Sequence, residues 1–300
     1  MVPRRRAVVK TGLGSEKRHQ YNGTMERSVR QPVVAGSFYP ADPVRLRDAV
    51  RDSLGSDVPP RTSSSVGVIV PHAGYVYSGR VAGAGLRAAA AYGKPDVIVV
   101  LGASHSGAGG DFALPVEGAW RTPLGDVPLD VSGIERLVAL GMVRDAGAFR
   151  REHSMEVVLP FLQVLFPQPV PVLPVCVQLA PWAALASGAR SLVGAVGGQR
   201  VWIVASSDFT HYEPDDVARR VDRSALDLIL AGDAEGFYRQ TIDRGLTICG
   251  AGAICALLLV AHDLGLTRRS LVDYATSGDA TGDRSAVVGY AAVSFTKENS

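Results

Sequence analysis

Four continuous apolar segments constrain the fold of this chain more than any other feature of its sequence. Each has the length of a β-strand and is rich in β-branched side chains: VGVIV (66–70), DVIVVLG (96–102), PVLPVCVQ (171–178) and RVWIVASS (200–207). Runs in which apolar residues do not alternate with polar ones are typical of strands covered on both faces. We therefore expect these segments inside a sheet that has helices on its two sides.

Helical patterns separate these segments and cover residues 79–93, 154–166, 181–196 and 215–230. The alternation of strand and helix favours an α/β fold, namely a three-layer αβα sandwich with a largely parallel or mixed central sheet. Near the end of the chain, residues 270–277 and 286–295 flank a loop rich in glycine and aspartate, GDATGDR. We interpret them as two further strands, antiparallel to each other.

The segment AGAICALLLVA (251–261) is the nearest approach to a membrane span. It is shorter than the roughly 18 residues that cross a bilayer, and His262 and Asp263 follow it directly. We interpret it as a buried helix and expect no association with a membrane.

Charge is unevenly distributed along the chain. The first 24 residues contain six Lys or Arg and one Glu, whereas the whole chain has a net charge of only +2. The remainder is slightly acidic, so a basic face for nucleic acid is not expected. We interpret residues 1–28 as a disordered basic leader, or as an extension upstream of a start at Met25, and residues 29–298 as a single α/β domain.

The three cysteines, Cys176, Cys249 and Cys255, are odd in number and few for the length of the chain. They do not resemble a disulfide framework. The N-terminal segment also lacks the apolar core of a secretion signal. Both observations favour a cytoplasmic location, where the cysteines are thiols.

Three of the six histidines lie just past the C-terminal ends of predicted strands. They are His72, His105 and His211, and Asp208 precedes the last of them. In an open α/β sheet this edge is where ligands bind. Imidazole is the commonest protein ligand of metal ions, and several rings beside a carboxylate suit a first-row transition metal. The sequence therefore predicts a metal site at this edge.

Other interpretations compete with this one. Taken singly, each of these histidines is more often a hydrogen-bonded residue at a strand end, and only their common position favours a site. In EHSMEVVLPFL (152–162), we interpret Glu152 and Glu156 as favourable charges at a helix N-terminus, with Ser154 as a cap. This interpretation leaves His153 unexplained.

Small residues such as Gly74 and Gly102 adjoin the strand-end histidines and are interpreted as room for a ligand or metal. His19 and His262 are expected to be inert. The segment GASHSGAGG (102–110) lacks the pattern of a phosphate-binding loop, and the chain has no G-x-S-x-G nucleophile elbow. Nucleotide binding and serine hydrolysis are therefore disfavoured.

Six motifs carry a resemblance to a known family. They are RQPVVAGSFYPAD (30–42), PHAGYVYSG (71–79), LGASHSG (101–107), EHSMEVVLPFL (152–162), SSDFTHY (206–212) and LTICGAGAI (246–254). In this order and at these intervals the chain resembles the Memo family, whose bacterial and archaeal members are called AmmeMemoRadiSam system protein B. The resemblance extends from about Arg30 to about Phe295.

The resemblance implies the fold of the class III extradiol dioxygenases, non-haem iron enzymes that open catechol rings. In Memo proteins, two histidines and a cysteine line the corresponding pocket and are reported to hold iron or copper. By motif these correspond to His72, His105 and Cys249. Asp208 and His211 then correspond to the place where the dioxygenases keep an acid/base histidine, and His153 is expected to line the same pocket.

The chain departs from the dioxygenases at Cys249, since those enzymes use two histidines and a glutamate. A thiolate is softer and more easily oxidised than a carboxylate, which shifts the preference toward copper(I), zinc or a thiolate-ligated iron. Ring opening is accordingly disfavoured. We expect Asp208 to orient a ring nitrogen of a ligand. Ser106 and Ala251 differ from residues common in relatives and are expected to alter the size of the pocket.

These observations predict a metal-dependent, oxidoreductase-like protein that binds iron or copper and acts on an unidentified small molecule or peptide, with His211 as general base. A second hypothesis is a binding or adaptor module that keeps the pocket without turnover. A third is a zinc hydrolase, because two histidines, a cysteine and an activated water form a plausible zinc set. The resemblance also implies association with a radical SAM protein and an AMMECR1-domain protein.

Overall fold

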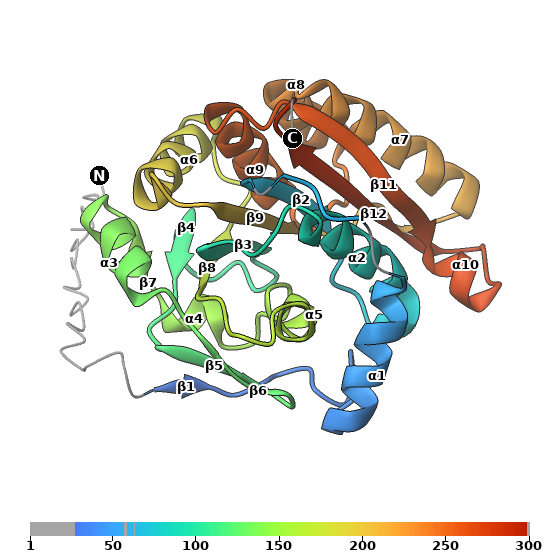
Figure 1. Ribbon diagram of the computed structural model, residues 1–300. Coiled ribbons are helices and arrows are strands. Elements are labelled where there is room, and N and C mark those ends of the chain that lie inside the picture. Colours follow the sequence, from blue (N-terminus) through green and yellow to red (C-terminus); the bar gives the residue numbers. More distant parts are fainter. Residues whose placement is uncertain (1–27, 57–58, 63, 299–300) are drawn as a thin grey trace, which may run out of the picture.

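The computed structural model describes residues 28–56, 59–62 and 64–298. The predicted leader, residues 1–28, lies outside this part of the chain except for its last residue, and so does His19. Figure 1 shows the described chain as a twisted sheet with helices on both sides.

The four predicted apolar segments form the parallel centre of a nine-stranded sheet. In spatial order they are β2 (Val66–Val70), β9 (Val201–Ser206), β3 (Val97–Ala103) and β8 (Val172–Val177). Each strand pairs in parallel with the next, and all of their residues are buried. Although β9 is the last of the four along the chain, it lies between β2 and β3 and brings its C-terminal end between theirs.

Antiparallel strands extend this centre. On one side, β12 (Val287–Thr296) pairs with β2, and it also pairs with β11 (Arg268–Thr276) and the short β10 (His211–Glu213). On the other side, β4 (Phe112–Leu114) runs antiparallel to β8, and β7 (Val143–Arg144) runs parallel to β4. The predicted antiparallel pair near the C-terminus is confirmed, and the sheet as a whole is mixed.

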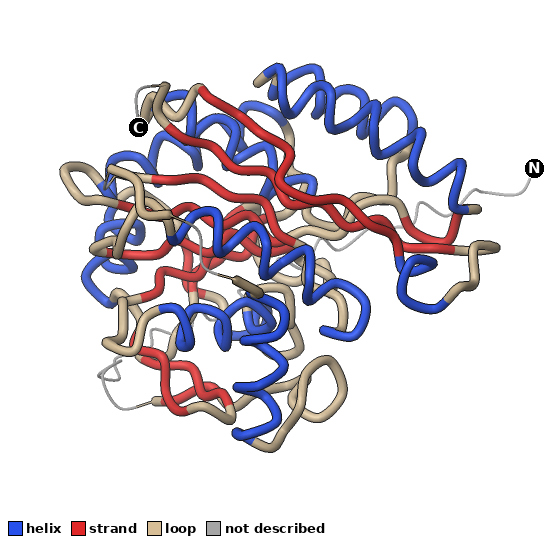
Figure 2. The backbone as a smooth tube through the Cα atoms, turned by 45° about the vertical axis from the view of Figure 1, so that its right-hand side comes forward, coloured by secondary structure: helices blue, strands red, loops and turns tan. Residues whose placement is uncertain are grey.

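Helices cover both faces of the sheet (Figure 1). One layer contains α1 (Pro43–Leu54), α2 (Tyr75–Ala90) and α5 (Leu159–Leu165), which pack on one another. The other contains α6 (Trp182–Val196), α7 (Asp215–Ala231), α8 (Ala234–Arg244) and α9 (Ala251–Asp263). Figure 2 shows the strands running between the two helical layers. The predicted three-layer α/β architecture is confirmed, and it is consistent with the class III extradiol dioxygenase-like fold.

Helix α9 is the predicted buried helix of the C-terminal region. It packs on α6 and α8 and on the four central strands. A helix that is apolar on all sides needs such complete cover. Among the residues that the structure describes, no helix is both long enough and apolar enough to cross a membrane.

The segment 154–166 differs from the single helix that its pattern predicts. It begins with a 3₁₀ turn, η2 (Glu156–Val158), and only then continues as α5. Pro160 lies in the first turn of α5. Because proline has no N–H to donate to the carbonyl four residues earlier, it is tolerated at the start of an α-helix but not further inside.

The remaining elements are short. A three-stranded sheet consists of β1 (Val29–Arg30), β5 (Ala119–Thr122) and β6 (Gly125–Pro128). Three helices complete the described chain: α3 (Val131–Ala139), α4 (Ala146–Phe149) and α10 (Ser277–Thr281). The small sheet and α4 lie near the segment that carries His153, which enters the site from outside the central sheet.

Candidate metal centre

Two of the predicted ligands, His72 and His105, meet at the C-terminal edge of the parallel strands. His72 follows β2 and His105 follows β3, on the two sides of the end of β9. Their ring centroids lie 5.2 Å apart, and the rings are nearly perpendicular, at 89°. The sheet topology therefore brings together two residues that are 33 positions apart in the sequence.

His153 completes a group of three imidazoles. It comes from the loop between α4 and η2, and its ring stacks on that of His105 with centroids 4.5 Å apart. The centroid of His72 lies 5.5 Å from that of His153. One ring nitrogen from each histidine lies within 4.8 Å of the others, which is close enough for all three to bind a single ion. Phe38 packs edge-on against His153 at 4.8 Å.

Hydrogen bonds fix the orientation of the His72 ring. The Ser206 hydroxyl donates to the Ser154 carbonyl at 2.6 Å, so it accepts from His72 Nδ1 at 3.0 Å. The proton of the neutral ring is thereby held on Nδ1, and Nε2 keeps its lone pair. His72 is 1% exposed, and its Nε2 faces the Cys249 sulfur at 3.2 Å.

The Glu152 carboxylate fixes the orientation of the His105 ring. The carboxylate lies 2.9 Å from His105 Nδ1 and also accepts from the backbone N–H groups of His105, at 2.9 Å, and Ser154, at 2.8 Å. The interpretation of Glu152 as a helix-terminal charge is wrong, because this side chain is 2% exposed and no helix begins beside it. A carboxylate on one ring nitrogen leaves the other free to bind a metal, a common arrangement in metal sites.

The electrostatics of the three rings follow from this arrangement. Burial, together with the charges that His105 and His153 would carry, lowers the pKa of His72. Burial and His105 also lower the pKa of His153. Burial acts in the same direction on His105, but the hydrogen bond and charge of Glu152 outweigh it, so its pKa is raised. Two of the rings thus favour the neutral form that binds metal ions.

Cys249 lies beside His72 rather than within the group of three imidazoles. Its Sγ is 3.2 Å from His72 Nε2 and 3.2 Å from the backbone nitrogen of Asp208, which donates to it. Burial, reinforced by the Asp208 carboxylate, raises the pKa of the thiol. The lack of a side chain at Gly250 allows the segment that carries Cys249 to approach β9, because a Cβ at Gly250 would lie 2.6 Å from the Ser206 carbonyl oxygen. The close approach brings the start of α9 against the end of β9.

Asp208 and His211 lie on the turn that follows β9. The Asp208 carboxylate accepts from the backbone N–H of His72 at 2.8 Å. It therefore holds the main chain of that histidine, whereas the sequence predicts a contact with a ring nitrogen. Burial raises the pKa of Asp208 to about 6. His211 Nδ1 donates to the carbonyls of Phe209, at 2.7 Å, and Thr247, at 2.8 Å. His211 Nε2 is left to accept a proton.

Comparison with known proteins identifies the family. The model of the Memo family, described as Memo-like protein, matches residues 30–294. This chain belongs to the Memo family. Its relatives include MEMO1 family proteins of Pyrobaculum arsenaticum, 39% identical over 282 residues, and of Desulfurococcus amylolyticus, 40% identical over 280 residues. These alignments cover 89% of this chain in both cases, and 99% and 98% of the relatives.

A solved structure also shares the fold. The crystal structure of an uncharacterized protein from Escherichia coli K12 aligns with 77% of this Memo-family chain and 99% of its own, with a TM-score of 0.52 and 13% sequence identity. At that identity the likeness concerns the fold alone.

The first Memo motif, residues 30–42, is anchored to the 3₁₀ turn η2 through Glu156. This carboxylate is fully buried and pairs with Arg30 at 2.8 Å. It also accepts from the Tyr39 hydroxyl at 2.8 Å and from the backbone N–H groups of Val33 and Val34. Its interpretation as a helix-terminal charge misses these partners. The Arg30 guanidinium donates to the Glu152 carbonyl as well, which links the N-terminal strand to the loop that carries His153.

Gly102 of the LGASHSG motif has a different role from the one expected. A Cβ at this position would lie 2.5 Å from both Met155 Cγ and Ser154 Oγ. The space that glycine leaves is therefore filled by the protein itself. The glycine therefore allows Ser154 and Met155, which follow His153, to pack closely against the end of β3.

The other predicted residues lie away from this centre. His262 is at the exposed end of α9, where its Nδ1 lies 3.1 Å from Asp263. Cys176 and Cys255 are buried, and all three cysteines are free thiols. Asp222 of α7, which the sequence did not suggest, accepts from both the backbone N–H and the hydroxyl of Thr210, and so anchors the turn that carries Asp208 and His211.

Proposed function

We propose that this protein binds one iron or copper ion between His72, His105 and His153, with the Cys249 thiolate as a fourth ligand, and uses it in redox chemistry on a small substrate. The observation that carries the proposal is the convergence of three imidazoles whose donor nitrogens lie within 4.8 Å of one another. Two of these rings have their second nitrogen engaged by Ser206 and Glu152, so their orientation is set before a metal arrives.

The donor set fits such an ion. Imidazole binds iron, copper and zinc, and a thiolate favours copper(I), zinc and thiolate-ligated iron. Sγ of Cys249 and Nε2 of His72 already face each other at 3.2 Å. The raised pKa of the thiol disfavours the thiolate in the metal-free protein. Binding of the ion would therefore release the thiol proton.

When bound, iron or copper supplies one-electron redox chemistry. The residues of the chain orient the ligands and handle protons. His211 is the proposed general base, because its Nδ1 proton is held by two backbone carbonyls and Nε2 remains available. Glu152 and Asp208 hold His105 and His72 in place through the ring and the main chain, respectively.

Oxygen uptake tests this function. Protein loaded with iron or copper is supplied with catechols and with thiols, and oxygen is followed with an electrode. Sustained uptake that requires the metal and falls at least tenfold in His211→Gln supports the proposal. Binding of the metal without any uptake would instead support a module that retains the pocket as a receptor for a small molecule or peptide.

The third imidazole also favours a second candidate, a zinc hydrolase. Catalytic zinc sites bind the ion through three protein ligands and keep a position open for water, and three histidines are one of the known sets. Metal analysis separates the candidates: protein from cells supplied with iron, copper and zinc together retains zinc alone if it is a zinc enzyme.

The role of Cys249 is tested by its replacement. The cobalt(II) or copper(II) form of the wild-type protein should show an intense thiolate-to-metal absorption band. In Cys249→Ser the band disappears while one metal ion per chain is retained, because the three imidazoles remain. His153→Ala should do the reverse, keeping the band and weakening the affinity. An identical spectrum for wild type and Cys249→Ser would remove the thiolate from the ligand set.

A cytoplasmic location is also proposed, and the three free thiols support it. Association with a radical SAM protein and an AMMECR1-domain protein is likewise proposed from the resemblance alone.

A further inference from the structure

A cavity lies at the opposite edge of the sheet from the histidines. Its volume is about 380 Å³, within the range of small-molecule sites. Three segments enclose it: α1, the turn between β5 and β6 together with β6, and α5 together with the chain that follows it. Its floor contains the first paired residues of β3 and β8, Ile98 and Val172. His105 follows the other end of β3, so the two sites are separated by the length of that strand, roughly 20 Å.

The floor of this cavity and part of its walls consist of apolar side chains. Ile98, Val172 and Leu162 are buried beneath it, and Leu124, Val164 and Phe166 form its partly exposed walls. The polar side chain in the wall is Gln163, and its amide is already satisfied: it accepts from Thr122 at 2.6 Å and donates to the Gly125 carbonyl at 3.1 Å. An occupant therefore meets both polar and apolar groups, with apolar side chains at the floor and in the walls.

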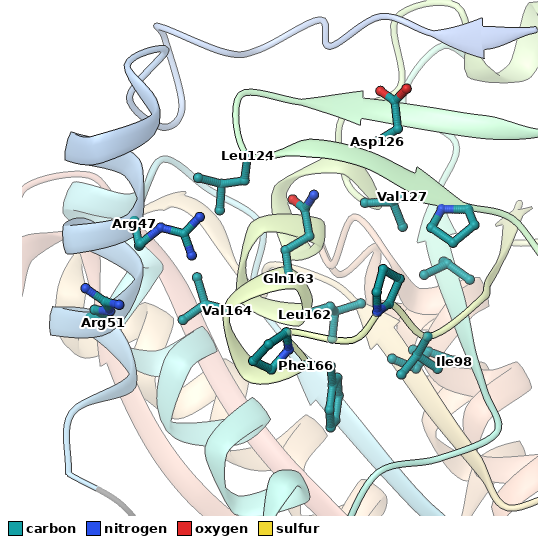
Figure 3. A pocket seen from close by; sticks show the side chains of 15 residues that line it. Arg47, Arg51, Ile98, Leu124, Asp126, Val127, Leu162, Gln163, Val164 and Phe166 are labelled. Carbon is teal, nitrogen blue, oxygen red and sulfur yellow. The ribbon is translucent and has the colours of Figure 1, made fainter.

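Two arginines give the mouth of the cavity its charge. Arg47 and Arg51 are four residues apart on α1, so their side chains lie on the same face of the helix. Figure 3 shows Arg47 extending from α1 into the space between Leu124 and Val164. Within the described residues, neither guanidinium has a hydrogen-bond or ion-pair partner.

The acidic residue at the mouth does not neutralise these arginines. Asp126 lies on the opposite rim, and its carboxylate accepts two hydrogen bonds from Arg121, at 2.7 Å and 2.9 Å. Its charge is thus offset by its own partner. The cavity combines an apolar floor with two guanidinium groups on one side, and guanidinium groups match the geometry of a carboxylate.

We propose that this cavity binds an aliphatic monocarboxylate, with the carboxylate between Arg47 and Arg51 and the hydrocarbon chain against Leu124, Val164 and Phe166. Arg47 and Arg51 are the cationic residues that line the cavity, and among the described residues the wall that would face the hydrocarbon chain offers no cation for a second carboxylate. The proposal is independent of the metal centre, because the cavity shares no residue with it.

Octanoate is the probe for this site, and octan-1-ol and octylammonium are its neutral and cationic counterparts. We expect octanoate to bind to the full chain with a dissociation constant of about 1 mM or lower, measured by NMR on methyl-labelled protein. The signals of Ile98, Leu162 and Val164 should shift. The alcohol and the ammonium compound should bind at least tenfold more weakly, and added salt should weaken octanoate binding.

Variants test the role of the arginines. Arg47→Gln/Arg51→Gln should weaken octanoate binding at least tenfold and leave octan-1-ol unaffected. The matched control is Arg45→Gln, an exposed arginine of the same helix that does not line the cavity. All three arginines are exposed, so these variants are expected to fold. Equal binding of octanoate and octan-1-ol, shifts confined to other methyl groups, or no effect of the double variant would each overturn the proposal.

Discussion

The substitution Glu152→Gln removes the charge that orients His105 while keeping the size of the side chain. The carboxylate now accepts from His105 Nδ1 and from two backbone N–H groups. An amide has only one accepting oxygen, so at least one of these donors would face an NH₂ group. If His105 adapts by moving its proton to Nε2, the nitrogen that should bind the metal loses its lone pair. Either outcome weakens metal binding.

The size of the expected loss in metal affinity follows from other metal-binding histidines that have lost a hydrogen-bond partner. Loss of a hydrogen-bond partner of a metal-binding histidine typically lowers affinity 10- to 100-fold, which equals about 1.4–2.7 kcal/mol. The buried donor left without a partner costs about 1–3 kcal/mol of folding stability. We expect Glu152→Gln to bind zinc(II), used as a redox-inert probe, 10- to 100-fold more weakly than wild type in a competition titration with a chelator.

Glu156→Gln is the matched control. Glu156 is equally buried and hydrogen-bonded but contacts Arg30, Tyr39 and the backbone rather than a histidine. The Glu156→Gln variant should lower the unfolding midpoint in urea by about as much as Glu152→Gln does. It should change the affinity for zinc less than threefold. If Glu152→Gln binds zinc as tightly as wild type, or if both variants lose affinity equally, the carboxylate does not orient the ligand and the reasoning is wrong.

Two further predictions concern stability. Gly102→Ala places a Cβ 2.5 Å from Met155 Cγ and should destabilise the fold by about 1–3 kcal/mol; an unchanged urea midpoint would contradict the packing described. The hydrogen bond from Arg219 lowers the pKa of Asp215 from 3.8 to about 2. The ionised Asp215 carboxylate therefore contributes fully to folding stability above about pH 4, and this contribution is lost as the pH falls toward 2. Thermal unfolding of Asp215→Asn should therefore depend less on pH between 4 and 2 than that of wild type, and parallel curves would refute this.

The central strands and the two strand-end histidines were predictable from the sequence. Runs of apolar residues that do not alternate with polar ones, such as 66–70 and 96–102, indicate buried strands. Parallel strands bring their C-terminal ends to one edge of the sheet. The structure has β2 and β3 within one residue of these bounds, and His72 and His105 each lie two residues past the end of their strand. In these cases a local pattern determines both the element and the position of its last side chain.

The supports of the site were not predictable in this way. Glu152 precedes a helical pattern, so its charge suggested a helix terminus, but its partner His105 is 47 residues away. Gly102 suggested space for a ligand, whereas the space is filled by Ser154 and Met155. Such long-range pairings depend on how a loop packs on the sheet, and hydrophobic periodicity contains no information about them.

The short edge strands escaped prediction for a related reason. Strands of two to four residues, such as β4 and β7, are too short for a periodic signal to develop. Their pairing is decided by their neighbours in the sheet.

The metal content of the purified protein tests the central claim most directly. Wild-type protein, isolated from cells supplied with iron and copper, should contain one ion per chain by mass spectrometry. His72→Ala and His105→Ala, each checked for folding by circular dichroism, should contain less than a tenth of that amount, while His262→Ala should match wild type. Wild-type protein without bound metal, or full occupancy in both site variants, would contradict the account.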